Sequence, residues 1–154
     1  MQLFLIRHAH ALDGGDDAAR PLSARGRKQV RTLARGLKRA GVFDAAEVWH
    51  SPLLRARDTA ALLVRRVGAP AKLVETSGLT PGDDPAVMAA RLRWRRQPLA
   101  IVGHEPHLSA LASLLVAGAA APPVFVLRKC AALALERIRG RWVVRWLLAP
   151  ELFA

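Results

Sequence analysis

The sequence predicts an α/β/α sandwich around a mostly parallel sheet. Short apolar runs, of the length that buried strands have, alternate along the chain with longer amphipathic segments typical of helices. This alternation is the pattern of helices that cover both faces of a parallel sheet. Near the end of the chain, two strand-like segments are instead separated by a short turn at Gly140. We therefore expect an antiparallel hairpin at one side of the sheet.

Capping residues place the ends of several predicted helices. Ser23 is a good N-cap and Gly41 is suited to end the same helix. Ser51 as an N-cap and Pro52 at the first helical position predict the start of a second helix. The predicted elements, in order, are a strand at 3–6, a helix from Ser23 to about Ala40, a strand at 47–50, a helix from Ser51 to about Val67, a strand at 72–74, a helix from Asp84 to about Arg93, a strand at 99–102, a helix from Pro106, and strands at 131–138 and 142–148.

Length and composition predict one cytoplasmic domain over residues 1–154. The chain is 52% hydrophobic and 23% charged, as is usual for globular proteins. We expect no signal peptide, because Arg7 and His8 interrupt the first apolar run. No run of about 18 apolar residues is free of charge or proline, so no membrane span is expected. Cys130 is the single cysteine, which excludes an internal disulfide.

The net charge of +12 favours an anionic partner. Most of the basic residues are arginines, which pair bidentately with phosphate and carboxylate groups. Such a surface also suits nucleic acid, so a basic nucleic-acid-binding domain is the non-enzymatic alternative. The arginines are dispersed and no nucleic-acid motif is present, and we therefore expect no nucleic acid as partner. A cluster of arginines at 91, 93, 95 and 96 is the first candidate for meeting an acidic protein.

Residues suited to phosphate chemistry follow three of the predicted parallel strands. Ligands of open parallel sheets bind beyond the carboxyl ends of the strands, which all lie at one edge. A histidine nitrogen can attack phosphorus, and arginine forks can stabilise the phosphoryl oxygens. A second histidine and a helix N-terminus would add hydrogen bonds and positive potential. The residues after the first, second and fourth predicted strands are Arg7 and His8, then His50, Ser51 and Arg55, then His104 and Glu105.

Three blocks of sequence resemble the signature of the histidine phosphatase superfamily, whose fold is called phosphoglycerate mutase-like. They are Leu5-Ile6-Arg7-His8-Ala9, the segment from Ser51 to Ala60, and Val102-Gly103-His104-Glu105-Pro106. The blocks occur in the family's order, each at a predicted strand end. The short chain, the segment from Arg20 to Gly26 and the triplet Leu79-Thr80-Pro81 resemble the SixA-type phosphohistidine phosphatases.

The resemblance implies a metal-independent phosphatase without a cofactor. His8 would be the phosphorylated nucleophile, and Arg7, Arg55 and His104 would form the rest of the phosphate pocket. Arg20 would join this pocket from its loop. The signature glycine is Ala9 here, a small residue that still allows a close approach of the backbone unless the position needs a positive φ.

The proton donor is less clear than the nucleophile. Relatives of this branch often have a glutamate just before the Leu-Thr-Pro triplet, but this chain has Gly78 there and Glu75 three residues earlier. Glu105, directly after the second histidine, is the other candidate, because the acid phosphatase branch places its donor there. We favour Glu105 over Glu75. A phosphohistidine substrate would need little protonation, since imidazolium is already a good leaving group.

The leading hypothesis is removal of phosphate from phosphohistidine of a signalling protein, such as a histidine-containing phosphotransfer domain. The alternative enzyme acts on a small phosphate ester by the same chemistry. The shortness of the chain favours an open site and therefore a protein substrate, and a monomer is expected. Apart from these residues, Trp142 and Trp146 are expected to share one face of the last strand.

Overall fold

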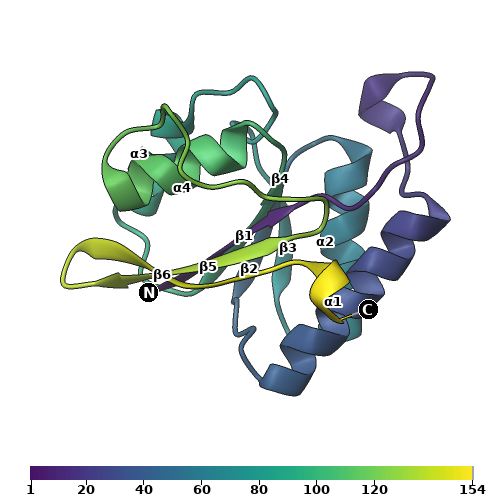
Figure 1. Ribbon diagram of the computed structural model, residues 1–154, viewed down its shortest axis with the longest axis horizontal. Helices are drawn as coiled ribbons and strands as arrows, with labels where there is room; N and C mark the ends of the chain where they lie inside the picture. The colour runs from purple at the N-terminus through teal and green to yellow at the C-terminus, as the bar shows by residue number, and fades with distance from the viewer. Residues whose placement is uncertain (154) are drawn as a thin grey trace.

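The computed structural model describes residues 1–153 and contains a six-stranded sheet in the order β3-β2-β4-β1-β5-β6 (Figure 1). Four strands are parallel, namely β1 (Gln2–Arg7), β2 (Glu47–His50), β3 (Lys72–Glu75) and β4 (Leu99–Gly103). The last two, β5 (Ala132–Ile138) and β6 (Arg141–Leu148), form an antiparallel hairpin, and β5 is antiparallel to β1. The predicted fold class is confirmed.

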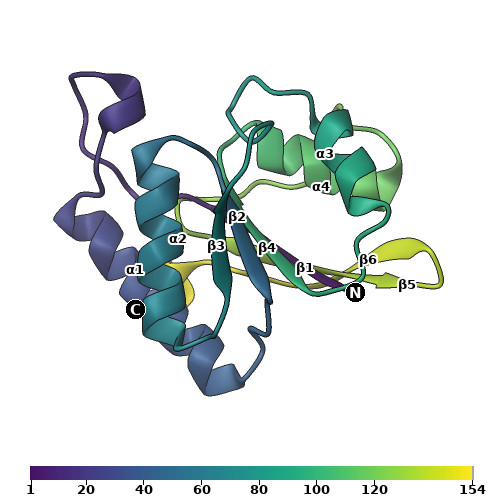
Figure 2. The ribbon, with the colours of Figure 1, turned by 180° about the vertical axis from the view of Figure 1, so that it is seen from behind.

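Helices cover both faces of the sheet (Figures 1 and 2). On one face lie α1 (Ala24–Ala40) and α2 (Leu54–Val67), and on the other lie α3 (Pro85–Leu92) and α4 (His107–Ala117). Phe4 and Ile6 of β1 pack into the core on the α1 side, and the alternate residues Leu3 and Leu5 pack into the core on the α4 side. Because both faces are buried, β1 is apolar at successive positions.

The predicted caps are confirmed for α1 but not for α2. Ser23 Oγ accepts a hydrogen bond from the Gly26 N–H at 3.0 Å, and Gly41 ends α1 with a left-handed φ of 63°. The predicted start of α2 is wrong, because its N-cap is Leu53 and its first helical residue is Leu54. Ser51 accepts a hydrogen bond from the Leu53 N–H at 3.1 Å in the turn before the helix. Its hydroxyl is thereby placed at the end of β2.

The prediction that Trp142 and Trp146 share a face of β6 is wrong. The pairing register of β5 and β6 shifts between Ala134 and Leu135, so β6 carries one extra residue there. Trp146 packs on the α1 side of the sheet, with its ring centroid 5.9 Å from that of Phe4. Trp142 packs against the core on the other side. A bulge of this kind reverses the faces of all residues beyond it.

Two short 3-10 helices lie outside these layers. One, η1 (Asp17–Ala19), belongs to the loop that joins β1 to α1. The other, η2 (Pro150–Phe153), follows β6 and lies beside α1 (Figure 1). The loop that contains η1 is the one that brings acidic residues to the carboxyl edge of the sheet.

Candidate active site

The carboxyl ends of β1, β4 and β2 are neighbours in the sheet, and the two predicted histidines meet there. The His8 N–H donates to the Gly103 carbonyl at 2.9 Å, so the ladder between β1 and β4 continues past the end of β1. His104 follows directly, and the imidazole rings of His8 and His104 lie with their centroids 5.0 Å apart. Both side chains are buried, with residue exposures of 4% and 2%.

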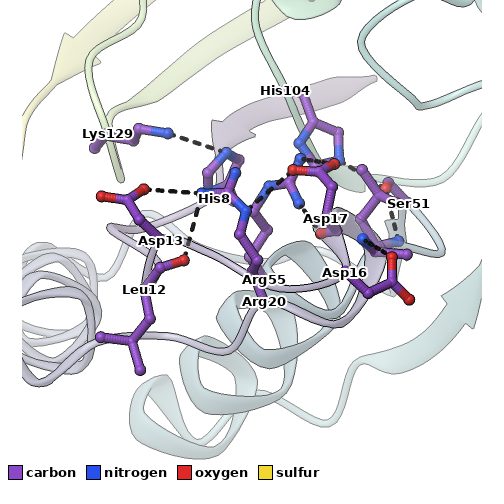
Figure 3. Close-up of polar contacts among 12 residues, drawn as sticks. His8, Leu12, Asp13, Asp16, Asp17, Arg20, Ser51, Arg55, His104 and Lys129 are labelled. Carbon is purple, nitrogen blue, oxygen red and sulfur yellow. Dashed lines mark hydrogen bonds and ion pairs between the residues drawn. The ribbon is translucent and has the colours of Figure 1, made fainter.

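The ring of His8 is held in one orientation. Its Nδ1 lies 2.7 Å from the Ala9 carbonyl oxygen, which can only accept a hydrogen bond, so Nδ1 carries the proton. The lone pair of the neutral ring is therefore on Nε2. Burial, aided by the nearby charge of Lys129, lowers the pKa of His8 to about 2. His8 is thus neutral at physiological pH, and its Nε2 lies toward Lys129 (Figure 3).

Thr59 ties the loop after β1 to α2. Its Oγ1 accepts a hydrogen bond from the Ala9 N–H at 3.0 Å and donates one to the Arg55 carbonyl at 2.7 Å. Ala9 has no positive φ; among the described residues other than glycine, only Cys130 and Arg139 adopt one. Alanine therefore fits the position where the signature has glycine.

Arg55 and Arg20 meet at one carboxylate. The Arg55 guanidinium donates to the Asp17 carbonyl at 2.8 Å and to the Asp17 carboxylate at 3.2 Å, and Arg20 Nε donates to the same carboxylate at 3.0 Å. The Arg55 charge is the main cause that lowers the pKa of Asp17. Asp17 and both arginines lie beside the two histidines (Figure 3). Arg20 thus reaches the predicted pocket by way of Asp17.

His104 is held by Ser51, the residue expected to be only a helix cap. His104 Nε2 and Ser51 Oγ share a hydrogen bond of 2.7 Å. Burial, followed by the charge of Arg55, lowers the pKa of His104 to about 3. The second ring nitrogen, Nδ1, is buried without a hydrogen-bond partner among residues 1–153. His104 is therefore neutral, and its Nδ1 is available for a further hydrogen bond.

Arg7 and Glu105 lie close together at the same edge. Arg7 donates from one terminal nitrogen to the Leu127 carbonyl at 2.9 Å. Burial lowers the pKa of Arg7, and the negative charge of Glu105 partly opposes this change. Glu75 instead ends β3, where it lies opposite His50 of β2 and away from β1. Within residues 1–153, no hydrogen bond joins either glutamate to His8 or His104.

Comparison with known proteins identifies the family. The sequence model of the histidine phosphatase superfamily (branch 1) matches residues 3–79. The chain belongs to the histidine phosphatase superfamily. Phosphohistidine phosphatase SixA of Escherichia coli K12 is 29% identical over 155 residues, which cover 97% of this chain and 94% of that protein. An uncharacterized protein of Picosynechococcus is 35% identical over 125 residues, or 77% of this chain and 74% of that protein.

A solved structure of the protein histidine phosphatase SixA, complexed with tungstate, has the same fold. It superposes with a TM-score of 0.89 at 26% sequence identity, and the match covers 100% of both chains. These relatives confirm the phosphoglycerate mutase-like fold and indicate that this histidine phosphatase family member is a phosphatase.

Lys129 is a site residue that the sequence reasoning missed. Its Nζ donates a hydrogen bond to His8 Nε2 at 3.2 Å (Figure 3). Burial, followed by the charges of Arg7 and Arg55, lowers the pKa of Lys129 to about 8. The sequence pattern points only to residues that follow parallel strands. However, Lys129 precedes β5, and the amino end of an antiparallel strand lies at the same edge as the carboxyl ends of its parallel neighbours.

A basic groove adjoins the site. It has a volume of about 580 Å³ and reaches from Arg7 and Lys129 along α1 to Pro150 and Glu151 of η2. Arg128 in its wall pairs with Glu151 at 3.1 Å, and the other basic residues have no such carboxylate partner in the groove. The lining residues of this basic groove are Arg7, Arg25, Lys28, Gln29, Thr32, Arg128, Lys129, Pro150 and Glu151.

The arginine cluster at 91–96 is divided between the two edges of the sheet. Arg95 pairs with Glu47 at 2.9 Å, at the start of β2, and its guanidinium carbon lies 5.0 Å from the centroid of the Trp49 ring. Arg137 donates to the carbonyls of Leu92 and Arg93. These contacts hold Arg93 and Arg95 at the amino ends of the parallel strands, opposite His8, whereas Arg91 donates to the Ser77 carbonyl at 2.8 Å, beyond the carboxyl end of β3.

Proposed function

We propose that the protein is a phosphatase that carries the phosphoryl group on His8 Nε2. The observation that supports this proposal is the hydrogen bond from His8 Nδ1 to the Ala9 carbonyl, which places the lone pair on Nε2, where Lys129 Nζ now donates to it. In the first step, a bond forms from Nε2 to phosphorus while the bond from phosphorus to the leaving group breaks. The leaving group takes that electron pair and a proton, which Glu105 donates in this proposal. In the second step, water attacks phosphorus and gives a proton to the Glu105 carboxylate, and the electron pair of the P–N bond returns to Nε2.

Arg7, Arg55 and His104 stabilise the charge of the phosphoryl oxygens in this proposal. Arginine forks are suited to these oxygens because they donate two parallel hydrogen bonds. Asp17 now accepts the hydrogen bonds of Arg55, so a phosphoryl group has to share or replace that carboxylate. The chemistry needs no cofactor, since fixed cations supply the positive charge. Arg20 contributes through the carboxylate that it shares with Arg55.

The substrate that we propose is phosphohistidine of an acidic signalling protein, such as a phosphotransfer domain. Two observations support a protein substrate. The relative that aligns over 97% of this chain is named a phosphohistidine phosphatase. In addition, the basic groove leads directly away from the site and offers several cations to the acidic surface around a phosphohistidine. A small phosphate ester remains the alternative substrate, and it would use the site without the groove.

The test of the nucleophile is to trap labelled phosphate on the enzyme from a phosphorylated phosphotransfer protein. Wild type should acquire an acid-labile label, and His8→Ala should acquire none. His10→Gln, a change in the same loop, should be labelled like wild type, because His10 bonds Ser23 and Gln29 and not the phosphate pocket. A wild type that neither takes up label nor dephosphorylates the donor would refute the proposal.

The substrate class is tested by charge reversal in the groove. Arg25→Glu and Lys28→Glu should each lower kcat/KM for the phosphoprotein about fivefold, as expected for ~1 kcal/mol of partly exposed charge contact. Neither change should affect a small donor such as phosphoramidate. Arg31→Glu on another face of α1 is the matched control, because Arg31 does not line the groove. Equal losses with both donors, or none with the phosphoprotein, would favour the small-ester alternative.

Glu105 is proposed as the proton donor, and its test uses a leaving group that needs a proton. Glu105→Gln should slow turnover of an alkyl phosphate far more than turnover of phosphoramidate. Unchanged turnover of the alkyl phosphate would remove Glu105 from this role.

The single-domain organisation, the cytoplasmic location and the monomeric state stay predictions. Within residues 1–153, no helix has the length and apolarity that crossing a membrane requires.

A further inference from the structure

We propose that Lys129 is a catalytic residue, which holds the lone pair of His8 in the free enzyme and moves to a phosphoryl oxygen when His8 Nε2 bonds phosphorus. This inference rests on the proposed function of His8. It adds Lys129 to the predicted set, which consists of Arg7, His8, Arg20, Arg55, His104 and Glu105. The resemblance to known phosphatases does not include it, because Lys129 lies outside the three sequence blocks.

The direction of the hydrogen bond is the first argument. Lys129 Nζ lies 3.2 Å from His8 Nε2, and a donor at this distance points along the lone pair of the ring nitrogen. In a phosphohistidine, the phosphorus atom occupies that same direction. The ammonium group therefore has to leave the lone pair as the P–N bond forms. The phosphoryl oxygens are then the nearest acceptors, so the hydrogen bond that Lys129 donates passes from His8 Nε2 to a phosphoryl oxygen, and the proton stays on Nζ.

Backbone hydrogen bonds fix the position of the Lys129 main chain beside His8. The Cys130 N–H donates to the His8 carbonyl at 3.2 Å, and the Arg7 N–H donates to the Ala131 carbonyl at 3.1 Å. Lys129 thus belongs to the segment that pairs with the end of β1. Cys130 adopts a φ of 61°, which turns the chain at this point. The sheet thus places the backbone of Lys129 beside His8, and its half-buried side chain reaches Nε2 from there.

The charges around Lys129 give it a reason to bind a phosphoryl group. Arg7, Arg55 and Arg20 all repel its ammonium group, and Asp13 attracts it. His8 faces it as a neutral acceptor. A phosphoryl group with two negative charges would attract Lys129 and the three arginines, and this attraction would oppose the repulsion among them. The ammonium form is needed for this contact, so activity should fall as Lys129 loses its proton above a pH of about 8.

The experiment follows phosphorylation of His8 by phosphoramidate in single turnovers, as a function of pH. Lys129→Met keeps the length of the side chain without its charge and should slow phosphorylation about 100-fold, as loss of one preorganised donor does. The fall in rate above pH 8 should disappear in this variant. Lys129→Arg keeps the charge, so it should recover part of the rate and move the fall to higher pH. Lys38→Met at the far end of α1 is the control and should behave like wild type.

The outcomes separate this inference from the proposed function. Wild type that acquires no label on His8 refutes the function itself. Labelled wild type together with a Lys129→Met variant of equal rate and unchanged pH profile refutes only the role of Lys129. If Lys129→Met fails to fold, Lys129→Arg provides the test. Its pH profile should shift to higher pH if the inference is correct, and an unchanged pH profile would refute the inference.

Discussion

Replacing Thr59 by valine should weaken both stability and catalysis. Thr59 is fully buried, and its hydroxyl joins the Ala9 N–H at 3.0 Å to the Arg55 carbonyl at 2.7 Å. Valine has nearly the same shape, so Thr59→Val leaves no cavity. It removes the acceptor of the Ala9 N–H, one residue after the nucleophile, and it unties that residue from the helix that carries Arg55.

The size of the effect follows from the two lost hydrogen bonds. Ala9 is fully buried, so its N–H would be left without an acceptor, at a cost of about 1–3 kcal/mol. The Arg55 carbonyl loses less, since a carbonyl within a helix also accepts a backbone N–H. At about 3 °C per kcal/mol for a chain of this length, the melting temperature should fall by roughly 3–9 °C. A small displacement of His8 should slow phosphorylation by about tenfold to 100-fold.

Two measurements and one matched variant decide the matter. Urea unfolding gives the loss of stability, and single-turnover labelling of His8 gives the loss of rate. Thr59→Ser removes only a methyl group, at about 1 kcal/mol, and keeps both hydrogen bonds. It should therefore lose stability but keep its rate. A Thr59→Val variant as fast as Thr59→Ser would show that the link between Ala9 and Arg55 does not position the nucleophile.

Three further predictions concern the same edge of the sheet. Ser51→Ala removes the hydrogen-bond partner of His104 Nε2. It should slow labelling of His8 about tenfold and lower the free energy of unfolding in urea by about 1–3 kcal/mol. An unchanged labelling rate together with an unchanged free energy of unfolding would contradict the contact. Gly26→Ala would place a Cβ 2.0 Å from a backbone carbonyl oxygen of the loop after β1, and it should lower the free energy of unfolding by about 1–3 kcal/mol or more. Gly36→Ala in the same helix meets only a movable ring and should change the free energy of unfolding by less than about 1 kcal/mol. Equal effects of the two variants on thermal unfolding would refute the packing argument. The pKa values of His8 and His104 are lowered to about 2 and about 3, so the unfolded chain takes up protons at these residues below about pH 6.5 and the native protein does not. The free energy of unfolding should therefore fall by about 1.4 kcal/mol per pH unit for each histidine as the pH drops from 6.5. A flat pH profile in urea unfolding would show that both histidines titrate normally.

The sequence predicted the residues that follow parallel strands better than those placed by other elements. His8 and His104 each come directly after a buried apolar run, and such runs are easy to recognise. Lys129 precedes an antiparallel strand, so its approach to His8 depends on how β5 pairs with β1. A pattern of strands and helices does not specify that pairing. The amino end of an antiparallel strand that pairs with β1 lies at the same edge as His8, and this geometry places Lys129 at the site.

Single residues with two possible roles were also difficult to predict. Ser51 followed by Pro52 is a strong signal for the start of a helix, yet the helix begins at Leu54 and the hydroxyl of Ser51 bonds His104. A capping residue and a site residue have the same polar side chain, and only the position of the neighbouring strand decides between them. The extra residue in β6 is similarly invisible, because the segment keeps its strand-like composition through the bulge.

The glutamate expected at position 78 is absent, and the backbone conformation explains the glycine found there. The resemblance to phosphohistidine phosphatases suggests a glutamate there, but the chain adopts a φ of 83° at this position. A left-handed backbone strongly favours glycine, so the local turn alone accounts for the residue. A proton donor, where the reaction needs one, therefore has to come from another element, and Glu105, whose charge acts on Arg7, is the carboxyl group that we propose.

The cations of the site act on the nucleophile as well as on the phosphoryl group. Lys129 and Arg55 both lower the pKa of His8, and Arg55 and Lys129 lower that of His104, in each case after burial. Two histidines whose ring centroids lie 5.0 Å apart can therefore both stay neutral, and the attack that we propose for His8 Nε2 starts from a neutral ring. Once a phosphoryl group is bound, its negative charge opposes these cations and raises the proton affinity of His104. The same arrangement thus favours a neutral ring before attack and a proton-donating ring beside the transferred group.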